Sequence, residues 1–80
     1  MDNLSEFRKR AYVHALKVMA YLQSHSVGST LKQSIIAHKI MNELNNLIEL
    51  AENEGTKRQI ERYSMVISNL LVRWWIARKG

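Results

Sequence analysis

This chain is divided into three parts by two short stretches, Gly28–Gln33 (GSTLKQ) and Gly55–Gln59 (GTKRQ). In each stretch a glycine precedes a threonine, and a glutamine stands three residues after the threonine. A threonine hydroxyl can cap the first turn of a helix, and a glutamine at that spacing can reach back to the main-chain N–H of the cap. Asn3 and Glu6 repeat this spacing near the start of the chain. The pattern therefore predicts three helices, each opened by a capping box.

Apolar residues recur at intervals of three, four and seven in each part, which is the spacing of one helix face. The expected core residues are Leu4, Phe7, Ala11, Val18 and Leu22 in the first part, Ile36, Ile40, Leu44, Leu47 and Ala51 in the second, and Ile60, Tyr63, Ile67, Leu70, Trp74 and Ala77 in the third. We expect helices over about residues 4–25, 31–53 and 57–78. Matched lengths and short connections predict an all-α, three-helix antiparallel (up-down-up) bundle in a single domain, residues 1–80.

The composition limits the class of protein. A chain of 80 residues has room for one thin core, and a catalytic cleft is not expected by default. Cysteine is absent, which excludes disulfides and thiolate metal sites, so the cytoplasm is the expected location. The apolar run at residues 11–22 is interrupted by His14 and Lys17 and is too short to span a bilayer. We therefore expect no membrane helix.

The charges are distributed unevenly along the chain. In the expected topology, the start of the first helix, the end of the second and the start of the third share one pole, where acids and bases balance. The opposite pole, called the basic pole here, has Glu43 at its margin and carries the net charge of +5 on Lys17, Lys32, Lys39, Arg73, Arg78 and Lys79. Such a surface attracts nucleic acid, anionic lipid or an acidic protein face, although a basic surface with no specific ligand is the alternative.

Two adjacent tryptophans, Trp74 and Trp75, lie near the end of the chain. Neighbouring positions on a helix point about 100° apart, so only one of them can belong to the core stripe. We assign Trp74 to the core and Trp75 to a flank that also carries Val72, Arg78 and Lys79. An exposed indole beside cations can stack on a base or anchor a protein interface, and partial burial at the edge of the core is the alternative.

The first helix has more apolar residues than one stripe needs. A helix that is apolar nearly all round takes a central position in a bundle or forms a second interface. Val72, Trp75 and Ile76 are the corresponding excess on the third helix. We therefore expect a protein partner or a homodimer, with an interface that includes Val72, Trp75, Ile76, Tyr12, Leu16 and Met19.

The sequence contains no pattern typical of a metal site. His14, His25 and His38 lack the spacing of three or four residues that places two ligands on one helix face, and acidic residues are missing nearby. We expect His14 to be a partly buried core residue.

Catalytic patterns are absent as well. Several serines lie near His25, but no carboxylate in that stretch could orient the imidazole, so a helix connection is the simpler interpretation. Residues 28–30 could contact one anion at a helix start, yet the spacing and lysine of a nucleotide-binding loop are missing. We expect no enzymatic activity, no cofactor and no small-molecule substrate.

Two binding functions follow from these patterns. The first is contact with the nucleic acid backbone, or with a nucleic-acid-processing complex, through Lys17, Lys32, Lys39, Arg73, Arg78 and Lys79, with Trp75 available for stacking. The second is an adaptor or inhibitor that binds a larger protein directly through Val72, Trp75 and Ile76, as small phage and plasmid regulators often do. Attachment to a membrane surface ranks last, because the apolar stripe of the third helix is needed for the core.

Overall fold

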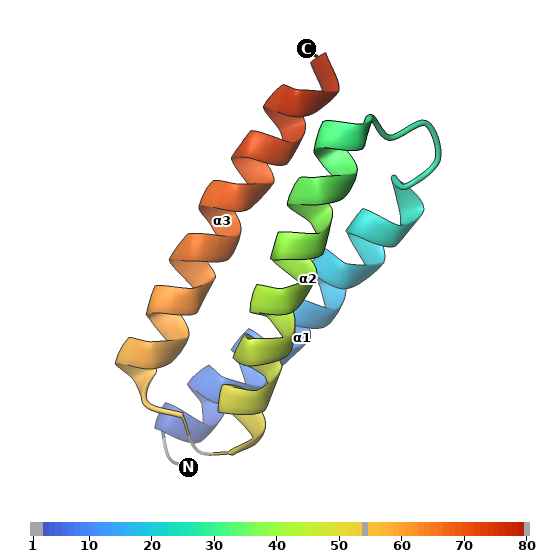
Figure 1. Ribbon diagram of the computed structural model, residues 1–80. Coiled ribbons are helices and arrows are strands. Elements are labelled where there is room, and N and C mark those ends of the chain that lie inside the picture. Colours follow the sequence, from blue (N-terminus) through green and yellow to red (C-terminus); the bar gives the residue numbers. More distant parts are fainter. Residues whose placement is uncertain (1–2, 54, 80) are drawn as a thin grey trace.

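The computed structural model describes residues 3–53 and 55–79, with side chains described for residues 5–53 and 55–78. This part of the chain forms three helices, α1 (Asn3–Ser24), α2 (Leu31–Glu52) and α3 (Lys57–Lys79). They run up, down and up in an elongated bundle of 45 × 20 × 15 Å (Figure 1). The predicted all-α, up-down-up bundle is confirmed, and each helix boundary lies within one residue of its expected position.

The predicted capping boxes mark the starts of α2 and α3. Thr30 is the N-cap of α2: its Oγ1 accepts a hydrogen bond from the Gln33 N–H at 3.0 Å, and its own N–H donates to Gln33 Oε1 at 3.1 Å. Thr56 and Gln59 form the same pair of bonds at 3.2 and 3.0 Å. The predicted box at Asn3 falls on a side chain outside the described ones.

Both internal glycines serve the connections between helices. Gly28 has φ +78°, in the left-handed region that side chains disfavour. Gly55 follows α2 closely, because its N–H donates to the Leu50 carbonyl oxygen at 2.6 Å. A Cβ at residue 55 would lie 2.8 Å from that same oxygen. Glycine is thus favoured at position 28 by the backbone conformation and at position 55 by the close approach to Leu50.

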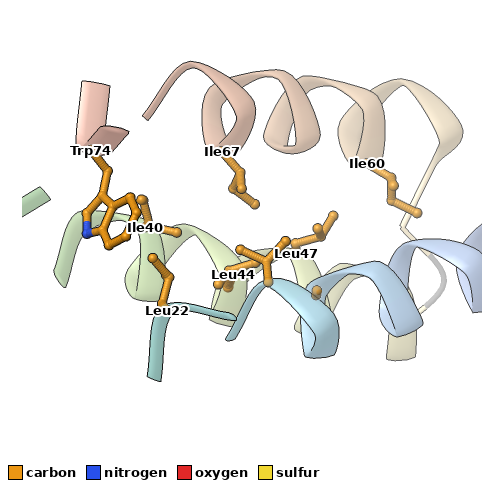
Figure 2. Close-up of a cluster of buried hydrophobic side chains, with 9 residues drawn as sticks. Leu22, Ile40, Leu44, Leu47, Ile60, Ile67 and Trp74 are labelled. Atoms are coloured by element: carbon orange, nitrogen blue, oxygen red, sulfur yellow. The ribbon is translucent and has the colours of Figure 1, made fainter. Parts of the chain in front are cut away.

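The core is a column of side chains that runs the length of the bundle (Figure 2). Its fully buried members include Ile40, Leu44 and Leu47 of α2, each with 0% exposure, and they meet residues of both other helices. Those residues are Ala15, Val18 and Leu22 of α1, and Ile60, Ile67 and Trp74 of α3. All of these except Ala15 belong to the predicted stripes, so the periodicity identified the core correctly.

The middle position in the bundle belongs to α2. This helix packs extensively against both neighbours, whereas α1 and α3 touch each other least. The apolar arc of α2 is wide: Ile36 and Met41, which both pack against the core, lie about 140° apart around the helix. Of the two alternatives for the apolar excess of α1, the central position is therefore excluded, and its extra apolar residues are not explained by burial between two neighbours.

Candidate functional site

Side-chain contacts bring the end of α1, the start of α2 and the end of α3 together. Gln33 Nε2 donates to the Trp74 carbonyl oxygen at 3.3 Å, which joins the first turn of α2 to α3. The rings of Tyr21 and Trp75 have centroids 6.3 Å apart, which joins the last turn of α1 to the same part of α3. At the other pole, Lys57 Nζ lies 5.4 Å from the centroid of the Phe7 ring. The Gln33–Trp74 and Tyr21–Trp75 contacts thus show that the three helix ends of the basic pole are neighbours in space.

Glu43, four residues after Lys39 on α2, is the one acidic residue close in sequence to the cations of the basic pole. No Asp or Glu occurs between Phe7 and Asn42 or after Arg62. The side chains of Lys17, Lys32, Lys39, Arg73 and Arg78 are all exposed, and that of Lys79 lies outside the described side chains. The neutral pole differs, because Glu52 lines one hollow there together with Arg8 and Lys9. Charge is therefore balanced at one pole and unbalanced at the other.

Two separate hollows flank α3 at the basic pole. The α1/α3 hollow has a volume of about 540 Å³ and is lined by His14, Lys17, Val18, Tyr21, Leu71 and Trp75. The α2/α3 hollow has a volume of about 360 Å³ and is lined by Lys32, Ile35, Ile36, Lys39, Leu70, Arg73, Ile76 and Ala77. The predicted contact residues therefore divide into two sets, because α3 separates Lys17 and Trp75 from Lys32, Lys39 and Arg73.

Trp75 belongs to an aromatic cluster at the rim of the α1/α3 hollow. Its ring makes an edge contact with Trp74, with centroids 5.7 Å apart, and Tyr21 lies beside it. The guanidinium carbon of Arg78 is 5.9 Å from the centroid of the Trp75 ring, a cation–π distance. Trp74 is 1% exposed and Trp75 is 45% exposed. The assignment of the first tryptophan to the core and the second to a flank is confirmed.

The residues expected at a protein interface differ in their exposure. Leu16, Val72 and Ile76 are 46%, 58% and 64% exposed. Tyr12 and Met19 are only half-buried, and Met19 packs against the core. Exposed apolar surface is thus present on both α1 and α3.

Sequence reasoning missed three residues of this region. Tyr21 contacts both tryptophans and stacks on His25, with ring centroids 4.2 Å apart. Gln33 is 1% exposed although it was expected only as part of a cap. Ile35 is 53% exposed and lines the α2/α3 hollow. A signal for Ile35 existed, because adjacent isoleucines at positions 35 and 36 cannot both face the core.

The histidines lie apart from one another. His14 is exposed at the α1/α3 hollow, so the expectation of a partly buried core residue is wrong: the contact between α1 and α3 is too slight to cover it. His25 Nδ1 lies 2.9 Å from the Tyr21 carbonyl oxygen, and His38 Nδ1 lies 2.8 Å from that of Ser34. Among the described residues, no group of three His, Cys, Asp or Glu side chains could hold a metal ion.

The serines near His25 are bonded to the main chain. The hydroxyls of Ser24, Ser26 and Ser29 donate to carbonyl oxygens at 2.9, 2.8 and 3.1 Å, respectively. The three acceptors are the carbonyl oxygens of Tyr21, Gln23 and His25, in and just after the last turn of α1, and the first two also accept a main-chain N–H. The predicted interpretation of this segment as a helix connection is confirmed.

None of the described helices combines the length and the apolar character needed to cross a membrane. Comparison of the chain with protein-family models, with curated proteins and with solved structures finds no match. The two hollows beside α3 and the charges around them are therefore the features that indicate a function.

Proposed function

We propose that this chain is a small, non-enzymatic protein of the cytoplasm that binds single-stranded nucleic acid through its basic pole. The observation that carries the proposal is the environment of the Trp75 side chain. Nearly half of this indole is exposed, Arg78 lies over its ring, and Lys17 lines the same α1/α3 hollow. An aromatic face between cations is the usual combination for stacking a base while its neighbouring phosphates are neutralised.

Recognition in this proposal depends on the nucleic acid backbone rather than on base sequence. The helices have 22, 22 and 23 residues, and a helix-turn-helix would need a short recognition helix that projects from the domain. Phosphate contacts give strong, salt-dependent binding, and stacking on an indole accepts any base. We therefore expect little preference among sequences of equal length.

The test is a titration of a fluorescently labelled 20-nucleotide single strand, with anisotropy measured at several salt concentrations. For single strands the slope of log K against log salt is about −0.7 for each phosphate neutralised, so K17Q/R78Q should make it less steep by about 1.4. Trp75→Ala should weaken binding by about 1 to 3 kcal/mol if one base stacks there.

The matched control is R58Q/R62Q, which also removes two exposed arginine or lysine charges but does so at the neutral pole. This control should leave the salt slope unchanged. Absence of binding at low salt would contradict the proposal. An equal reduction of the salt slope in K17Q/R78Q and in R58Q/R62Q would also contradict it, because the effect would then follow net charge alone.

A second candidate function is that of an adaptor or inhibitor of a larger protein. It is favoured by the exposed apolar side chains of Val72 and Ile76, which contact with a nucleic acid backbone would not require. In that case Ile76→Ser should abolish capture of the partner while nucleic acid binding is retained.

A further inference from the structure

The α2/α3 hollow differs in composition from the α1/α3 hollow and from the hollow at the neutral pole. Its walls present Lys32 and Lys39 from α2 and Arg73 from α3, while Ile35 and Ile76 lie exposed within it. By contrast, the α1/α3 hollow has one lysine and no arginine, and the hollow between α1 and α2 at the neutral pole includes a carboxylate. Of these three hollows, the α2/α3 hollow is the one that combines several cations with exposed isoleucines and no acid.

The cations of this hollow lie along its length. Lys32 and Lys39 are seven residues apart on α2, which corresponds to about 10 Å, or two helical turns. The hydrogen bond from Gln33 to the Trp74 carbonyl places the start of α2 beside the last turns of α3. Arg73 of α3 therefore lies across the hollow from Lys32 of α2. A ligand that lies along the hollow could therefore meet positive charge on both sides.

We propose that the α2/α3 hollow docks an acidic amphipathic helix of a partner protein. The partner helix would place its apolar stripe on Ile35 and Ile76 and its Asp and Glu side chains against Lys32, Lys39 and Arg73. Two antiparallel helices form a groove into which a third helix packs by the ridges-into-grooves rule, and helix-in-groove recognition uses apolar anchors spaced by three, four and seven residues. This inference goes beyond nucleic acid binding and does not depend on it.

Other occupants fit this hollow less well. A nucleic acid strand would supply the negative charge, but its phosphates and sugars would leave the two exposed isoleucines without an apolar partner. A second copy related by two-fold symmetry would bring the same patch against itself, so Lys32, Lys39 and Arg73 would face their own equivalents. Repulsion between these facing cations would oppose the association of two copies. The acidic helix satisfies both the charge and the apolar surface.

The experiment is a selection from a display library of 18-residue peptides with fixed leucines at helical spacing and random residues elsewhere, carried out on the intact chain. We expect selected peptides to be enriched in Asp and Glu beside the leucines. Their affinity should fall by about tenfold or more in K32Q/K39Q and in I35S/I76S, because both charge and apolar anchors are lost. Circular dichroism of these variants should be unchanged, since all four side chains are exposed.

The matched control is again R58Q/R62Q, which should alter peptide affinity by less than about twofold because these arginines are at the neutral pole. The inference would be overturned if the selection yields no binder, if the binders are not acidic, or if K17Q/R78Q weakens them more than K32Q/K39Q does. It would also be overturned if a single strand shifts the NMR methyl signals of Ile35 and Ile76, or if K32E/K39E dissociates a homodimer. Failure of the oligonucleotide titration alone would leave these outcomes unaffected.

Discussion

Replacing Gln33 with glutamate tests the buried connection between α2 and α3. The Gln33 side chain is 1% exposed, its Oε1 accepts from the Thr30 N–H, and its Nε2 donates to the Trp74 carbonyl oxygen. Glutamate has the same shape and keeps the first bond, but it places a carboxylate oxygen where the donor stood, 3.3 Å from the Trp74 oxygen. Two acceptors would then face each other without water.

The expected loss is about 2 to 4 kcal/mol of unfolding free energy at pH 7. About 1 kcal/mol comes from the missing hydrogen bond, and the rest comes from the buried charge that lacks a partner. For a domain of this size, that loss lowers Tm by about 10 °C or more. The chain itself offers the control, because Gln59 occupies the same capping position but is exposed. Gln59→Glu should be neutral or slightly stabilising, since a carboxylate in the first turn favours the helix dipole.

Urea unfolding followed by circular dichroism at 222 nm measures both variants. The loss in Gln33→Glu should diminish in acid, because a protonated carboxyl can donate to the Trp74 oxygen again. The introduced carboxyl would hold its proton to a higher pH in the folded chain than in the unfolded chain, so the stability is present at low pH and is lost as pH rises. Equal changes in the two variants, with no dependence on pH, would refute the role assigned to the buried bond.

Three further predictions concern the core, the connections and association. Leu44→Ala should cost about 3 kcal/mol in urea unfolding because the side chain is fully buried, and a cost below about 1 kcal/mol would contradict the described core. Gly55→Ala should lower Tm because its Cβ would lie 2.8 Å from the Leu50 oxygen, whereas Gly28→Asn should be tolerated since asparagine accepts positive φ. We also propose that the chain forms a homodimer through the exposed side of α1, so Leu16→Glu should convert a dimer to a monomer in sedimentation; a monomeric wild-type chain would contradict this.

The helices could be predicted because their signals are local. Thr30 and Gln33 are three residues apart, and the bonds between them form within one turn whatever the rest of the chain does. The same holds for Thr56 and Gln59. The apolar period then assigned Ile40, Leu44 and the other buried apolar side chains of the core cluster correctly, with the exception of Ala15.

The candidate site could be predicted only in part. The sequence indicated which cations lie at the basic pole, because antiparallel order converts position along the chain into position along the bundle. It did not indicate that α3 divides them, with Lys17 and Trp75 on one side and Lys32, Lys39 and Arg73 on the other. That division depends on the rotation of each helix about its axis, which is set by packing against two neighbours at once.

The amino-acid sequence alone therefore specified three helices, their boundaries, their core stripes and the segregation of charge to one pole. Each of these depends on residues within a few turns of one another, or on simple order along the chain. The tertiary structure specified the middle position of α2, the burial of Gln33 against Trp74 and the two hollows beside α3. These features join residues that are distant in sequence, and their geometry follows from how the side chains of three helices pack together.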